Sequence, residues 1–323
     1  MDSAFCEKII EQILVSIENG SKRFLFWGVN PDMVYIFSKI KNLGLLQSFV
    51  VGLVDSNPAK NGLNINGINV SCPKDVKNMD FDTLVVCSDI DKEKILYDFL
   101  NYDNRIPKVI FAGTKHLQFQ DEIFQSIKNS CLVKSYANGY VNTLIHIYQT
   151  IEYLSKNGIK GDVVEFGIFK GGTTVFIAKV LKHFGFNDVK MYGFDIFDGF
   201  PKSKHLFDLY SNPDCEFSDY DSVDKYCKNF NIEVIKGDIC ETHEFLEDKK
   251  LMFTFFDTDN YSPSRKALET CYNQTVKGGI FAFDHYTTEE RFIYTIGERL
   301  ATKEFFADKN VFHLHDTGIF VKL

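Results

Sequence analysis

Five acidic residues in the second half of the chain stand at the ends of short apolar segments, where they could bind a cofactor or a metal ion. They are Glu165, Asp195, Asp238, Asp257 and Asp284. In open α/β sheets, ligands bind beyond the carboxyl ends of the strands. Acids repeated at that position therefore indicate one shared binding site rather than five unrelated turns.

Glycines follow the first of these segments and predict where a cofactor lies. The apolar run 163–166 leads into Gly167, Gly171 and Gly172. A backbone approaches a ligand closely only where no Cβ intervenes, and a helix start offers free N–H groups to a carboxylate or phosphate. A purely structural turn also uses two or three glycines. The spacing differs from the G-x-G-x-x-G of dinucleotide sites, which disfavours NAD.

Asp195 is the predicted ligand of a ribose. It closes the apolar segment 191–194 and lies 23 residues after Gly172, the length of one βαβ step. An ionised carboxylate accepts hydrogen bonds from both ribose hydroxyls, whereas the plainer interpretation is an acid that caps a turn. Gly237 and Asp238 end the next strand-like segment and are predicted to lie beside the base of the same nucleoside.

Two further segments carry the acids of an acceptor site. The run 251–256 is too apolar for a half-exposed strand and is typical of a central strand in a parallel sheet, and Asp257 follows it directly. The segment 279–283 is followed by Asp284 and His285.

Together these residues resemble the macrocin-type O-methyltransferase family, from about residue 140 to the end of the chain. The resemblance is carried by residues 164–167, 170–172, 192–195, 198–201, 236–238, 241–242, 257–259, 261, 278–279 and 284–286. It implies a domain that uses S-adenosylmethionine to methylate a sugar hydroxyl. The residues implied around the cofactor are Glu165, Gly167, Gly171, Gly172, Asp195, Gly237 and Asp238.

The resemblance also implies a divalent metal on the acceptor side, held by Asp257, Asp284 and His285. A Lewis acid lowers the pKa of an alcohol and fixes its oxygen in line with the methyl group, and hard oxygen ligands favour Mg²⁺. Family members end the fifth strand with two acids, whereas this chain has Asp284 and His285. His285 is then a metal ligand, a general base with a pKa of about 6.5, or a structural residue. Asp257 and His285 are the predicted catalytic residues.

The acceptor is predicted to be a small-molecule sugar, nucleotide-linked or a precursor of a surface polysaccharide. Two alternatives stay open, a nucleotide-sugar binding protein without catalysis and a methyltransferase of a phenolic or natural-product hydroxyl. Lys204, His205 and Tyr210, in a long loop between residues 202 and 231, could contact the acceptor, as could Tyr286 and Arg291.

The first third of the chain repeats the same kind of βαβ unit. Gly28 and Asp55 are 27 residues apart, against 28 for Gly167 and Asp195. This part loosely resembles the Rossmann-like domains attached to sugar-modifying enzymes. It either holds a nucleotide sugar through Gly28, Asn30 and Asp55 or builds an oligomer interface, and we favour the structural role.

Length and pattern predict two α/β domains. A chain of 323 residues normally divides into two cores. We expect a small Rossmann-like domain over residues 1–115, a linker over 116–137 and a methyltransferase domain over 138–323. The latter has a class I methyltransferase Rossmann-like sheet and ends in an antiparallel hairpin around the turn 316–318.

Composition excludes several classes of protein. Acids outnumber bases 44 to 36, and the net charge of -8 argues against a nucleic-acid partner. We find no apolar run long enough for a membrane span and no signal peptide, which predicts a cytoplasmic protein. The eight cysteines show no C-x-x-C spacing, which fits reduced thiols and argues against zinc. Because relatives associate, a homo-oligomer is expected.

Overall fold

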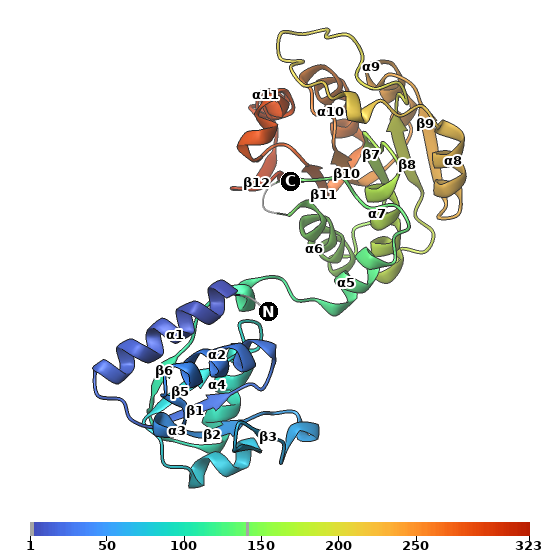
Figure 1. Cartoon of the computed structure of the whole chain (residues 1–323). Helices are drawn as coiled ribbons and strands as arrows, with labels where there is room; N and C mark the ends of the chain where they lie inside the picture. Colours follow the sequence, from blue (N-terminus) through green and yellow to red (C-terminus); the bar gives the residue numbers. More distant parts are fainter. Residues whose placement is uncertain (1–2, 140–141) are drawn as a thin grey trace. The chain divides into compact units, whose positions relative to one another are not determined.

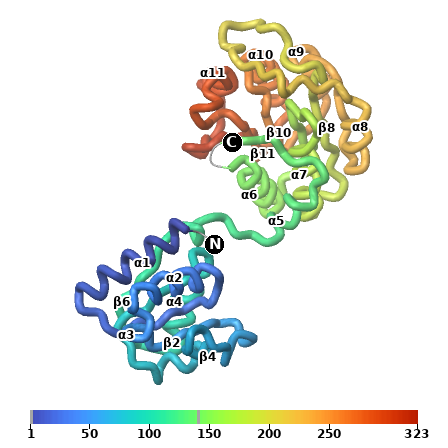
Figure 2. Tube along the Cα trace, viewed as in Figure 1, coloured from blue at the N-terminus to red at the C-terminus, as the bar shows by residue number. Residues whose placement is uncertain are grey.

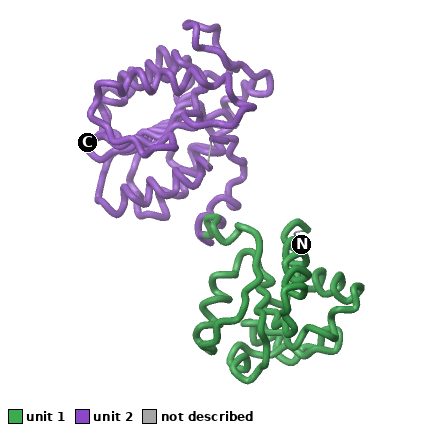
Figure 3. Tube along the Cα trace, turned by 90° about the vertical axis from the view of Figure 1, so that its left-hand side faces the viewer, with its two compact units in different colours: residues 1–120 green, residues 121–323 purple. Residues whose placement is uncertain are grey.

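The computed structural model describes residues 3–139 and 142–323, and these residues form two compact units. Unit 1 comprises residues 1–120 and unit 2 residues 121–323 (Figures 1 and 3). The boundary falls inside the segment that the sequence indicates as a linker. Two residues near the expected start of the methyltransferase domain, 140 and 141, lie outside the described range.

Unit 1 is a parallel sheet with helices packed against it. Its six strands lie in the order β3-β4-β2-β1-β5-β6, and only β3 pairs antiparallel to its neighbour. All four side chains of β1 are buried, because both faces of the sheet are covered. The elements are α1 (Ser3–Glu18), β1 (Phe24–Trp27), α2 (Pro31–Asn42), α3 (Leu46–Phe49), β2 (Val50–Val54), β3 (Asn64–Ile65), β4 (Ile68–Ser71), β5 (Thr83–Val86), α4 (Lys92–Tyr102) and β6 (Lys108–Ile110), with 3-10 turns η1 (Pro58–Lys60), η2 (Pro73–Asn78) and η3 (Lys115–Leu117).

Unit 2 is built on a seven-stranded sheet in the order β12-β13-β11-β10-β7-β8-β9, with β13 antiparallel to β11. Figure 2 traces the path of this unit from α5 to α11. This arrangement confirms the predicted sheet and its terminal hairpin. The elements are α5 (Glu122–Asn129), α6 (Thr143–Lys156), β7 (Asp162–Phe166), α7 (Gly172–His183), β8 (Met191–Asp195), α8 (Tyr220–Lys228), β9 (Ile232–Lys236), α9 (Ile239–Thr242), β10 (Leu251–Phe256), α10 (Tyr261–Gln274), β11 (Thr275–Phe283), α11 (Ile296–Phe306), β12 (Val311–Leu314) and β13 (Ile319–Lys322), with 3-10 turns η4 (Pro213–Cys215), η5 (His243–Leu246) and η6 (Glu290–Thr295).

The register of the central strands brings the predicted acids to one edge of the sheet. Phe256, the last residue of β10, pairs with Phe166 of β7 and with Phe283 of β11. The residues that follow these three strands must therefore be neighbours. The rings of Phe166 and Phe283 stack on Phe256 at centroid distances of 5.4 and 4.5 Å. The stacked rings pack β7, β10 and β11 together directly before the residues that follow these strands.

Two segments contain more regular structure than the sequence suggests. The expected linker holds α5, whose Phe124 packs against Phe176 of α7 at 5.8 Å between ring centroids. The long loop after β8 holds α8, which begins at a capping residue, Asp219. Both helices are short and bury only one or two side chains, Phe124 in α5 and Val223 and Cys227 in α8. So short a repeat gives little periodic signal, and the segments therefore resembled loops.

Two further observations concern the whole described chain. All eight cysteines are free thiols, four of them buried. Of the helices in residues 3–139 and 142–323, none is both long enough and apolar enough to cross a bilayer.

Candidate functional site

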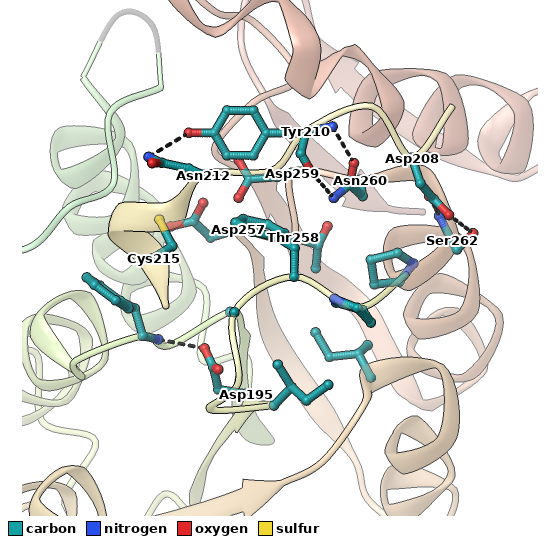
Figure 4. A pocket seen from close by; sticks show the side chains of 18 of the residues that line it. Asp195, Asp208, Tyr210, Asn212, Cys215, Asp257, Thr258, Asp259, Asn260 and Ser262 are labelled. Atoms are coloured by element: carbon teal, nitrogen blue, oxygen red, sulfur yellow. Dashed lines mark hydrogen bonds between the residues drawn. The ribbon is translucent and has the colours of Figure 1, made fainter. Parts of the chain in front are cut away.

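A cavity of about 560 Å³ opens at the carboxyl ends of β7, β8, β10 and β11 (Figure 4). This volume lies in the range of ligand pockets, about 300–1,000 Å³. The segment 199–217, which contains η4, forms part of its wall. Of the predicted site residues, those that line the cavity are Gly167, Asp195, Asp238, Asp257 and His285.

Asp195 organises the two loops at the cofactor end of the cavity. Its Oδ2 accepts the N–H of Phe169 and its Oδ1 accepts the N–H of Phe197, both at 2.8 Å. Phe169 and Phe197 have φ angles of +49° and +54°, which are rare for bulky side chains and cost about 1–3 kcal/mol each. The carboxylate thus holds a strained backbone in place. Its predicted contact with a ribose would use the remaining lone pairs.

The glycines of the first loop are needed for close packing of the chain with itself. A Cβ on Gly167 would overlap the carbonyl oxygen of Asp257, and one on Gly172 would overlap that of Lys134. Gly171 caps α7 with a φ of +76°. Gly171 and Gly172 lie outside the lining of the cavity, so their predicted role beside the cofactor remains a prediction.

The other predicted cofactor residues have different surroundings. Glu165 is 1% exposed, and burial raises the pKa of its carboxyl to about 8. Its Oε2 has no hydrogen-bond partner among the described residues. Asp238 lines the cavity, accepts the N–H of Cys240 and forms an ion pair of 2.7 Å with Lys204. Gly237, with a φ of +150°, turns the chain before it.

Asp257, Asp259 and His285 converge at the other end of the cavity. One ligand atom from each lies within 4.8 Å of the others, which is a spacing that could hold a metal ion. His285 Nε2 is 3.1 Å from Asp259 Oδ1 and 3.8 Å from Asp257 Oδ1. Asp259, which sequence reasoning had treated only as part of a motif, adopts a φ of +60°. The αL conformation turns its carboxylate toward the histidine, and Asp tolerates that conformation better than most residues.

Asp284 is placed behind this cluster. Its Oδ1 accepts from Gly139 N at 2.9 Å and from the Thr143 hydroxyl, and its Oδ2 accepts from Asn138 N. Oδ2 also lies 3.3 Å from His285 Nε2. Asp284 is not one of the three residues whose ligand atoms converge, which are Asp257, Asp259 and His285. Its role as a metal ligand therefore stays a prediction.

Glu298 is a buried carboxylate that the sequence analysis missed. It lies in the first turn of α11 and accepts backbone N–H groups from Thr258 and His285, at 3.0 and 2.8 Å. A signal for it exists in the sequence. Glu298 falls on the buried stripe of its helix with Ala301, Thr302 and Phe305, where an acid is out of place.

The cluster carries an excess of negative charge. Within the described residues, no lysine or arginine forms an ion pair with Asp257, Asp259 or Asp284. Burial and the neighbouring acids raise the pKa of Asp257 well above its usual value. Burial lowers the pKa of His285, but the hydrogen bond to Asp259 and the charges of Asp284, Asp259 and Glu298 outweigh it and raise that pKa to about 9. A divalent cation would balance these carboxylates, so the donor set fits one.

A segment over the cavity is tied to the start of α10. Asp208 accepts Ser262 N at 2.8 Å and the Ser262 hydroxyl at 2.7 Å, and Tyr210 and Asn260 exchange two hydrogen bonds of 2.9 Å (Figure 4). Lys204 and Tyr210 line the cavity, as expected for acceptor contacts.

The other expected acceptor residues are engaged elsewhere. Tyr286 packs against Phe320 and His313 of the C-terminal hairpin. Arg291 pairs with Glu289, and both side chains are exposed. The ring of His205 stacks on Tyr261 at 4.1 Å between centroids.

The three residues considered for a nucleotide sugar in unit 1 serve the fold itself. Asn30 caps α2 by accepting Met33 N, and its amide donates to the carbonyl of Cys87. Asp55 accepts Val29 N and forms an ion pair of 3.0 Å with Lys60. Gly28 has a φ of +104°, a conformation that favours glycine.

The sheet of unit 2, with its antiparallel last strand and its acid-lined cavity, has the fold of a class I methyltransferase. The model of the macrocin O-methyltransferase family matches residues 140–320, more than half of the 323 residues. The chain therefore belongs to this family of S-adenosylmethionine-dependent O-methyltransferases. A second family model, described as C2185-like N-terminal, matches residues 20–110.

Several known proteins are similar to parts of this chain. The mycinamicin III 3''-O-methyltransferase of Micromonospora griseorubida is 25% identical over 157 residues, which is 44% of this chain. The aligned part spans 62% of that relative. The structure of the O-methyltransferase NovP is 19% identical, with a TM-score of 0.47 over 55% of this chain and 78% of its own. The MycE methyltransferase from the mycinamycin biosynthetic pathway, in complex with Mg and SAH, is 14% identical, with a TM-score of 0.38 over 63% of this chain and 55% of its own.

Proposed function

We propose that this chain transfers the methyl group of S-adenosylmethionine to a hydroxyl group of a sugar, with the help of a divalent metal. One observation carries the proposal. A single cavity has Asp195 and Asp238 among its lining residues together with Asp257, Asp259 and His285. Cofactor and acceptor would therefore meet in one enclosed space, as a direct transfer requires.

The residues at the first end of the cavity suit S-adenosylmethionine. Asp195 would accept from the ribose hydroxyls. Two buried acceptors near the strand ends, Glu165 Oε2 and Asn138 Oδ1, have no hydrogen-bond partner among the described residues. Asn138 Oδ1 fits a donor group, and the ammonium of the methionine moiety is one. Glu165, whose pKa is raised to about 8, would accept from that ammonium once it gives up its own proton. The bound cofactor supplies an electrophilic methyl group.

The residues at the other end suit a divalent metal and the acceptor hydroxyl. Asp257, Asp259 and His285 would hold the metal, which makes a hydroxyl more acidic. The hydrogen bond to Asp259 at 3.1 Å and the neighbouring acids raise the pKa of His285 to about 9, so without a metal the imidazole would be protonated at neutral pH. A neutral imidazole is needed for ligation or for accepting a proton from the acceptor, so His285 must first lose that proton.

The support for a sugar acceptor comes from one relative and two lysines. The relative is named as a 3''-O-methyltransferase of mycinamicin III. Lys170 and Lys202 line the cavity, and neither forms an ion pair within the described residues. The Lys170 ammonium lies over the rings of Phe169, Phe217 and Tyr136. Lysines that have no carboxylate partner suit the phosphates of a nucleotide-linked sugar or another anionic precursor of a surface polysaccharide.

Three measurements test the proposal. Calorimetry should detect binding of S-adenosylmethionine, and Asp195→Ala should weaken it. Transfer of labelled methyl groups should be scored on nucleotide sugars, free glycosides and phenols, with sugars expected to be the acceptors. Chelation should abolish transfer and added Mg²⁺ should restore it. No binding of S-adenosylmethionine would overturn the proposal, whereas activity unchanged by chelator would remove only the metal.

A further inference from the structure

Glu298 joins the two loops that carry the acid cluster. Its Oε2 accepts Thr258 N at 3.0 Å, the Thr258 hydroxyl at 3.1 Å and Asp259 N at 3.3 Å. Its Oε1 accepts His285 N at 2.8 Å. One carboxylate from α11 thus receives donors from the loop after β10 and from the loop after β11.

The start of α11 is built to bring this carboxylate under the loops. A Cβ on Gly297 would overlap the carbonyl oxygen of Phe207 and would come within 2.8 Å of Tyr261 N. Glycine therefore lets α11 approach the start of α10. In the same helical turn, Arg299 donates to the carbonyl oxygen of Tyr286. This turn of α11 therefore contacts the loop after β11 at two points, through Glu298 and through Arg299.

Burial makes these contacts strong and hard to replace. Glu298 is 0% exposed. A buried N–H that loses its acceptor is left without a hydrogen-bond partner and without water, which is costly. The positions of the Asp259 and His285 backbones relative to one another therefore depend on both oxygens of Glu298.

We propose that Glu298 is a positioning residue that fixes the distance between the Asp257–Asp259 loop and the His285 loop, and so sets the affinity of the metal site. This inference rests on the proposed metal-assisted function. Glu298 does not line the cavity, so it acts through the backbones of residues that do. Groups that orient ligands in this way typically contribute about 10–100-fold to metal affinity.

The test uses the full chain and Mn²⁺ as an EPR-visible probe for the metal. In Glu298→Gln, the amide NH₂ must face either the His285 N–H or the N–H groups of Thr258 and Asp259, so one loop loses its acceptor. We expect Mn²⁺ binding to weaken about 10–100-fold, while binding of S-adenosylmethionine stays within about twofold of wild type. Glu304→Gln, on the same helix, is the control. Among the described residues, Glu304 accepts a hydrogen bond of 2.7 Å from the hydroxyl of the half-buried Tyr261 and makes no contact with either loop of the acid cluster, so Mn²⁺ affinity should not change.

A second variant keeps the test decisive if Glu298→Gln does not fold. Glu298→Asp retains the charge but is one methylene too short to reach both loops, and it should weaken Mn²⁺ binding less than Gln does. Wild-type Mn²⁺ affinity in a folded variant, even one with a lower Tm, would overturn the role of Glu298 and leave the metal proposal standing. Absence of Mn²⁺ binding to the wild type would overturn both.

Discussion

The two units place acids at matching positions of their sheets but neutralise them differently. The order β4-β2-β1-β5-β6 in unit 1 corresponds to β9-β8-β7-β10-β11 in unit 2. Asp55, after β2, pairs with Lys60, and Asp89, after β5, pairs with Lys92 at 3.0 Å. The equivalents in unit 2 are Asp195 and Asp257, and neither forms an ion pair with a lysine or arginine within the described residues.

The difference indicates which unit needs a ligand to balance the charge of its acids. A buried carboxylate requires a counter-charge or hydrogen bonds, and unit 1 supplies a lysine from its own chain. In unit 2, Asp238 also has a lysine partner, Lys204, but Asp257 and Asp259 face the cavity with only His285 beside them. Charge balance in unit 1 is complete without a ligand, whereas unit 2 gains from binding a cation. Under the proposed function, the same strand-end pattern serves structure in unit 1 and chemistry in unit 2.

The largest expected effect is the loss of methyl transfer in Asp257→Ala. Removing a group that stabilises reacting charge lowers kcat by about 100–1,000-fold. The same change removes one of several like charges, so the metal-free protein should become more stable. Transfer assays and thermal unfolding measure the two effects. Asp221→Ala, on the exposed side of α8, is the control, and unchanged transfer in Asp257→Ala would contradict the comparison.

Lys92→Met should destabilise unit 1 by about 3–5 kcal/mol, because it leaves the buried Asp89 without its counter-charge. Lys92 and Asp89 are only 2% and 7% exposed, and Lys92 also donates to Gly113 O at 2.8 Å. The double variant Asp89→Asn/Lys92→Met should recover part of this loss. Denaturant unfolding of the full chain measures the change. Binding of S-adenosylmethionine by unit 2 should be unaffected, and a loss of binding would show that the units are not independent in function.

Glu165→Gln should alter how stability depends on pH. The folded protein keeps the Glu165 proton up to a pKa of about 8, whereas the unfolded chain releases it near 4.5. Between these values the unfolded state binds fewer protons, so the contribution of Glu165 to the free energy of unfolding falls by up to about 1.4 kcal/mol per pH unit. The glutamine variant should lose that slope. Unfolding at pH 5, 6, 7 and 8 measures it, and a difference between variant and wild type that stays constant with pH would contradict the assignment.

Lys60→Met should have the smallest effect. The Lys60 side chain is 34% exposed, while Asp55 is 9% exposed, and Lys60 also donates to Val29 O at 2.7 Å. Solvent screens this ion pair more than the buried Lys92 pair, so its loss should cost about 1 kcal/mol. Asp55 also keeps two backbone donors, Val29 N and Asn57 N.

Calorimetry with UDP-glucose tests whether unit 1 binds a nucleotide sugar. We expect the wild-type protein and Asp55→Asn to give the same result with UDP-glucose. Binding of UDP-glucose to the wild type that Asp55→Asn abolishes would identify unit 1 as a nucleotide-sugar site.

Much of the fold could be predicted because it depends on local patterns. The apolar runs before Asp195 and Asp257, and the turn before the last strand, specify strands without reference to the rest of the chain. The helices α5 and α8 were missed because their stability comes from one or two residues, such as Phe124, that pack against distant elements.

The sequence alone determined which residues stand at the strand ends, and from their order the family and the fold of unit 2. Only the tertiary structure decided which of those acids converge. Asp259 reaches His285 because its backbone adopts a positive φ, and Asp284 is turned toward Asn138, Gly139 and Thr143. Glu298 joins the site from a helix 40 residues further along the chain than Thr258. Hydrogen bonds and charge balance between such distant residues exist only after the sheet has assembled, so no local pattern could reveal them.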